Sequence, residues 1–178
     1  MEEHRRLNPD RRILEKIIDL ERRIIDERRE IFSNKKLVGK LKEILIFSEL
    51  TNDEFKKVLS VCSREVFSKN EIIYHEGSTA DNMYILIDGV LEVTLEGKEL
   101  RFATPLSVIG DMGIFTRKPR SATITAKTDC ILLKLTKIEL SNLFKRTDML
   151  DKRFYLGMIK ELSNKLRKVN RFIIKLKK

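Results

Sequence analysis

Hydrophobic positions divide the 178-residue chain into three segments that differ in periodicity. Over roughly residues 9–33, apolar residues recur every three or four positions within highly charged sequence, which predicts an amphipathic helix. Over about residues 64–136, short β-branched and aromatic runs alternate with turn residues, and helical spacing then returns to the end. The apolar stripe of the first helix needs a packing partner, and both the rest of the chain and a second copy of the helix are candidates.

The middle segment predicts a small β-barrel or sandwich. Five of the seven glycines and two of the three prolines lie within it. Strands so short and closely spaced are typical of such folds. The expected strands are residues 71–75, 83–87, 90–95, 99–103, 121–126 and 130–135.

Helices are expected on both sides of these strands. Thr51–Glu54 and Thr136–Glu139 have the spacing of capping boxes, and the second predicts a helix through about Phe144. Beyond it, apolar residues alternate at spacings of four and three, which is the pattern of a two-stranded coiled coil. The alternative is a long helix that packs on its own barrel. The heptad positions are Tyr155, Ile159, Leu162, Leu166, Val169, Ile173 and Leu176.

The net charge of +10 arises mainly at the C-terminus, because residues 137–178 hold 13 Lys and Arg against 4 Asp and Glu. This excess is compatible with nucleic acid, an acidic partner or solubility alone. Neither a signal peptide nor a membrane-spanning stretch is present, so a soluble, cytoplasmic protein is expected. Cys62 and Cys130 are far apart among apolar residues, which predicts buried free thiols. We expect no metal site, no cofactor and no enzymatic activity, since no ligand cluster or nucleophile–base set is visible.

One arginine has the parity of a buried strand face. Along residues 120–126, alternation puts Arg120 on the same side as Ala122, Ile124 and Ala126. A guanidinium that points into a barrel keeps its charge and therefore needs an anion. An ion pair with Asp111 or an outward-pointing side chain are alternatives. Glycines at 110 and 113 permit a tight turn, and a helix that begins there could offer N–H groups to the same anion.

From about Phe47 to Arg171 the chain resembles the cyclic-nucleotide-binding domain, as in the catabolite activator protein and kinase regulatory subunits. Three spaced motifs carry this resemblance. The first is residues 45–51, which are typical of the family's entry helices. The second is the strand–turn–strand signature of Glu76-Gly77, Asp81, Tyr84, Ile85, Gly89 and Val93. The third is a phosphate-binding cassette, from Gly110-Asp111-Met112 through Pro119-Arg120-Ser121-Ala122. The resemblance implies a mainly β fold with flanking helices, namely an eight-stranded jelly-roll (double-stranded β-helix) barrel with N-terminal helices and a long C-terminal helix.

The family also implies a ligand and a role for each site residue. The expected ligand is cAMP or cGMP, whose cyclic phosphate Arg120 and Ser121 would hold with backbone N–H groups at Met112 and Gly113. The acid after Gly110 would accept the ribose 2′-OH. The family usually has Glu where this chain has Asp111, and one methylene less shortens the reach by about 1.5 Å. The C-terminal helix would cap the base near Asn164 and Lys165.

The expected organisation is an N-terminal helix (1–40), a cyclic-nucleotide-binding barrel with entry helices (41–146) and a basic C-terminal helix (147–178). The predicted function is a non-catalytic sensor without a helix-turn-helix output domain, forming a homodimer that acts on an effector protein and binds neither membrane nor DNA. One alternative is a degenerate barrel that serves as a protein-interaction module. The other is a nucleic-acid-binding protein that uses the basic tail, where residues 160–178 have a net charge of +7.

Overall fold

The computed structural model describes residues 33–176, so the helix expected over 9–33 lies almost wholly outside the described residues. Within this range eight strands form two antiparallel sheets of four, with orders β1-β8-β3-β6 and β2-β7-β4-β5. The predicted jelly-roll class is therefore confirmed. The strands are β1 (Ser63–Phe67), β2 (Ile72–Tyr74), β3 (Asn82–Asp88), β4 (Leu91–Leu95), β5 (Lys98–Ala103), β6 (Val108–Ile109), β7 (Thr123–Ala126) and β8 (Cys130–Thr136).

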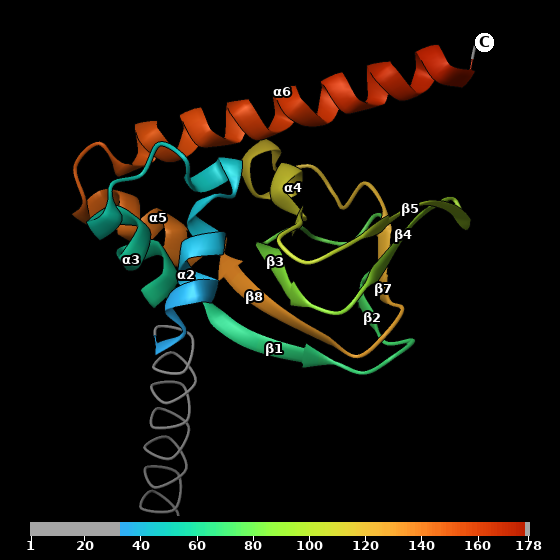
Figure 1. The fold of residues 1–178 in the computed structure, drawn as a ribbon, viewed down its shortest axis with the longest axis horizontal. Helices are drawn as coiled ribbons and strands as arrows, with labels where there is room; N and C mark the ends of the chain where they lie inside the picture. The colour runs from blue at the N-terminus through green and yellow to red at the C-terminus, as the bar shows by residue number, and fades with distance from the viewer. Residues whose placement is uncertain (1–32, 177–178) are drawn as a thin grey trace, which may run out of the picture.

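Helices gather at one end of the barrel, and the longest runs along its side (Figure 1). Both predicted capping boxes are confirmed: the Thr51 and Thr136 side chains each accept from the backbone N–H three residues on, and Glu54 and Glu139 each accept from the cap backbone. None of the helices within 33–176 has an apolar stretch long enough to cross a membrane. The helices are α2 (Lys35–Lys42), the 3-10 turn η1 (Leu45–Phe47), α3 (Asn52–Ser60), α4 (Asp111–Thr116), α5 (Lys137–Arg146) and α6 (Leu150–Leu176).

Two hydrophobic clusters explain why β3 is apolar on both of its faces. Tyr84 and Leu86 belong to the cluster inside the barrel, whereas Met83 and Ile85 belong to the cluster that includes the helices. Successive strand residues point to opposite faces, so a strand between two cores has no polar face. The outer face of β3 therefore packs the barrel against the helices.

The sequence-based strand boundaries need three corrections. β1 was not expected, because Ser-Arg-Glu-Val-Phe carries adjacent charges, although it pairs along its whole length with β8. β6 was not expected either, since two residues are too few to give a period. β7 begins at Thr123 rather than at 121, so Arg120 precedes the strand; its predicted burial with Ile124 and Ala126 is nevertheless confirmed.

One face of the first turns of α6 docks tightly, and from Ile159 onward the helix presents apolar side chains to solvent. Phe154 and Met158 are buried, and a Cβ on Gly157 would overlap the carbonyl of Ile46. From Ile159 to Ile173 the predicted heptad positions are 39–61% exposed. The alternative in which this stripe packs on its own barrel is therefore wrong for these residues.

Candidate functional site

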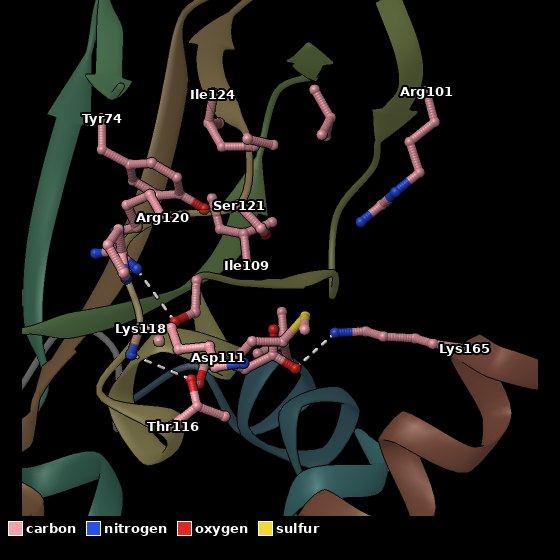
Figure 2. A pocket seen from close by; sticks show the side chains of 17 residues that line it. Tyr74, Arg101, Ile109, Asp111, Thr116, Lys118, Arg120, Ser121, Ile124 and Lys165 are labelled. Atoms are coloured by element: carbon pink, nitrogen blue, oxygen red, sulfur yellow. Dashed lines mark hydrogen bonds and ion pairs between the residues drawn. The ribbon is translucent and has the colours of Figure 1, made fainter. Parts of the chain in front are cut away.

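A cavity of about 330 Å³ opens where β6, α4 and the segment before β7 meet the flank of α6 (Figure 2). Its volume lies in the range of small-ligand pockets. Val93, Ile109 and Ile124 supply apolar walls, and charged groups line the remainder. The lining residues are Tyr74, Val93, Arg101, Val108, Ile109, Gly110, Asp111, Met112, Gly113, Thr116, Lys118, Pro119, Arg120, Ser121, Ala122, Ile124 and Lys165.

The turn from β6 into α4 requires glycine at its first position. Gly110 has φ +72°, in the left-handed region that side chains disfavour, and it precedes the first residue of α4. A Cβ there would also overlap Nη1 of Arg120. The glycine thus lets the backbone and the guanidinium approach each other, and the Gly110 carbonyl accepts a hydrogen bond from that Nη1 at 3.1 Å.

Arg120 is buried without a counter-charge. The residue is 5% exposed; Nη2 donates to Asn82 Oδ1 at 2.8 Å, and Cζ lies 4.0 Å from the ring centroid of Tyr74. Nε is buried and has no hydrogen-bond partner. Among residues 33–176 no carboxylate forms an ion pair with it. Since a buried charge is costly unless paired, a guanidinium in this setting is suited to binding an anion.

Asp111 has a different partner from the one considered in the sequence. The alternative of an Arg120–Asp111 ion pair is wrong: Oδ2 of Asp111 instead accepts from Nζ of Lys165 at 2.6 Å. The Asp111 side chain is 6% exposed and that of Lys165 is 32% exposed. Lys165 lies on α6, so the pair joins the long helix to the cavity wall (Figure 2).

Tyr74 covers the guanidinium from the barrel side. Burial raises the pKa of its hydroxyl to about 12, although the nearby charge of Arg120 acts in the opposite direction. Its ring therefore stays neutral over the physiological range and supplies a polarisable face to the cation. This contact helps hold Arg120 in one orientation.

The cavity brings together nearly all of the residues predicted from the sequence. Gly110, Asp111, Met112, Gly113, Arg120, Ser121 and Lys165 all line it, whereas Asn164 does not. Tyr74, Asn82 and Arg101 were missed. Asn82 could have been considered as a polar residue that opens an otherwise apolar strand, but nothing in the sequence links it to Arg120.

The family model described as cyclic nucleotide-binding domain matches residues 64–147. The chain is 24% identical over 135 residues to the cAMP-dependent protein kinase type II regulatory subunit of Drosophila melanogaster, which covers 72% of this chain and 36% of that protein. It is 34% identical over 104 residues to the cGMP-dependent protein kinase of Plasmodium berghei, covering 56% of this chain and 12% of that protein. The chain thus spans about a third or less of the length of these relatives.

Solved structures show the same fold. A cyclic nucleotide-binding domain from Methylobacillus flagellatus superposes with a TM-score of 0.70 at 19% identity, over 79% of this chain and 84% of that one. The catabolite activator protein of Thermus thermophilus gives a TM-score of 0.62 at 22% identity, over 75% and 63%.

Proposed function

We propose that the protein is a non-catalytic sensor that binds a 3′,5′-cyclic nucleotide in the cavity around Arg120, since residues 64–147 match the family model of the cyclic nucleotide-binding domain. The observation that supports this most directly is the buried guanidinium whose Nε has no partner. A cyclic phosphodiester carries one negative charge and two unesterified oxygens. It would supply both the missing charge and an acceptor.

The other site residues have proposed roles that follow from their positions around Arg120. Ser121 and the backbone N–H groups of Met112 and Gly113 would hold the phosphate oxygens. Oδ1 of Asp111 has no hydrogen bond among the described residues and would accept the ribose 2′-OH, while Oδ2 keeps Lys165. Ligand binding would then act on α6 through Lys165, provided that the ligand favours one position of that helix over another.

The test combines calorimetry and thermal shift with cAMP, cGMP, 5′-AMP and guanosine. Cyclic nucleotides should stabilise the fold by about 2.7 kcal/mol at 100 times Kd, and the two non-cyclic compounds much less. Arg120→Ala should weaken binding by about 2–5 kcal/mol, because the phosphate loses a buried charged partner. It should leave the apo protein close to wild type in unfolding free energy, since no carboxylate loses an ion-pair partner. If no cyclic nucleotide shifts the melting temperature at millimolar concentration, the protein is an interaction module with this fold.

The shorter acid at position 111 has its own test. Asp111→Glu extends the carboxylate by about 1.5 Å and should tighten binding of cAMP or cGMP relative to wild type. The same variant should not change the affinity for a 2′-deoxy cyclic nucleotide, which lacks the hydroxyl concerned. Weaker binding of both ligands would mean that the loop is built around aspartate, and the proposed ribose contact would then be wrong.

We further propose that α6 pairs with a second copy, with an effector protein as the downstream partner. The support is the exposed heptad from Ile159 to Ile173. The basic charges of residues 160–178 flank this stripe, and they are assigned to solvent or to an acidic partner rather than to DNA. DNA binding that weakens steeply with salt would contradict this assignment.

A further inference from the structure

A second cavity of about 360 Å³ adjoins the first, between α6 and the strands β5 and β6. The two share Arg101, Val108 and Lys165 in their linings. Figure 2 shows Arg101 directed from β5 toward the first cavity, with Lys165 reaching in from α6. The second cavity is completed by Ser107, Glu161, Lys168 and Val169. A ligand in the first cavity thus has space to extend under α6.

The two adjoining cavities are lined by more positive side chains than the single phosphate of a cyclic mononucleotide can contact. Both acids of the two linings, Asp111 and Glu161, pair with the same cation, Lys165, at 2.6 and 3.8 Å. Within residues 33–176 neither Arg101 nor Lys168 has a carboxylate partner, and both line the second cavity. One phosphate would match Arg120 alone, so the exposed side chains of Arg101 and Lys168 remain available to a second anion.

Resting on the proposed function, we propose that the second cavity is a second anion subsite, so that the preferred ligand is a nucleotide with two phosphate groups. One phosphate lies at Arg120, and the other lies between Arg101 and Lys168. The planar guanidinium of Arg101 suits two phosphate oxygens at once, and Lys168 adds a point charge. Two sources share this chemistry: a cyclic dinucleotide, and a mononucleotide with a second phosphate ester.

Calorimetry on the full chain tests this with cyclic di-AMP, cyclic di-GMP and adenosine 3′,5′-bisphosphate against cAMP. At least one of the first three should bind tenfold or more tightly than cAMP, and which one does so identifies the source. Arg101→Gln and Lys168→Gln should each weaken that ligand at least fivefold. Lys168→Gln should leave the Kd for cAMP within twofold, because Lys168 lines only the second cavity. Matched controls are Lys98→Gln on the same strand and Arg171→Gln on the same helix, which lie outside both linings and should change neither Kd.

Two results would overturn the second subsite. One is that no two-phosphate nucleotide binds more tightly than cAMP, and the other is that Lys168→Gln weakens cAMP as much as it weakens the two-phosphate nucleotide. Both leave the proposed function intact as long as cAMP binds the wild type and Arg120→Ala removes that binding. Failure of the proposed function is a separate result, namely no binding of cAMP or cGMP at all.

Discussion

Lys165 Nζ lies 2.6 Å from Asp111 Oδ2, and this ion pair joins two segments that are 54 residues apart in the chain. The carboxylate is buried and has this lysine as its ion-pair partner within residues 33–176, whereas the lysine also has Glu161 at 3.8 Å. The two residues should therefore differ in how much stability is lost when each is replaced. Removing the lysine leaves a buried charge, while removing the acid leaves a partly exposed one with another partner nearby.

We accordingly expect Lys165→Gln to lower the free energy of unfolding of the apo protein by about 1–3 kcal/mol, the cost of a buried acceptor without its donor. Asp111→Asn should cost less, and the double variant should lose less than the sum of the two. Urea denaturation measures all three. Lys160→Gln is the control on the same helix, because its ion pair with Glu49 lies at the surface and should contribute little to stability. Additive losses would show that the pair is not coupled.

The second prediction concerns the glycine beneath Arg120. Gly110→Ala should destabilise the fold by about 1–2 kcal/mol for its left-handed backbone, and it should also abolish ligand binding by displacing the guanidinium. Gly97→Ala is a matched control, since φ there is +74° but nothing lies within 4 Å of its Cβ. The melting temperature should fall by a similar amount in both variants. Calorimetry should detect no cAMP binding in Gly110→Ala and normal binding in Gly97→Ala. Retained binding would mean that Arg120 can move aside without cost.

The residues of this site differ in how far the sequence could predict their positions. The burial of Arg120 could be predicted from its alternation with Ile124 and Ala126, which is a local property, although the residue itself precedes β7. Asn82 and Tyr74 reach the same guanidinium from strands about 40 residues earlier, through pairings that no local period encodes. Likewise, the heptad spacing of α6 correctly predicted a continuous apolar stripe, but only the structure separates it from the neighbouring face that buries Phe154 and Met158.

The third prediction concerns assembly. Leu166→Asp should convert a dimer into a monomer, because it puts a charge in the middle of the exposed heptad stripe. Ile138→Asp is the matched control: this residue is the most exposed of the large hydrophobic side chains in the described part of the chain, and it lies on α5, outside the stripe. Light scattering with size-exclusion chromatography gives the mass of each. A wild type that is monomeric at high concentration would contradict the pairing of α6.

The fourth prediction concerns alkaline pH. Tyr74 ionises near pH 10 when unfolded and near 12 in the folded protein, so the folded state binds more protons between these values. Its contribution to stability is full below pH 10 and is lost as pH rises toward 12. Tyr74→Phe should therefore make the unfolding free energy fall less steeply than wild type from pH 9 to 11 in chemical denaturation. Equal slopes would show that burial does not hold this hydroxyl neutral.

The tight contact of Gly157 with Ile46 gives α6 a pivot point near its N-terminal end. Lys165 lies about 12 Å along the axis from Gly157, and the last helical residue lies about 28 Å from it, at 1.5 Å per residue. If the helix pivots there as a rigid rod, a displacement of about 2 Å at Lys165 becomes about 5 Å at the far end. A ligand that moves Asp111 and Lys165 together by this amount can thus change, by a full side-chain width, the spacing of whatever the distal turns contact.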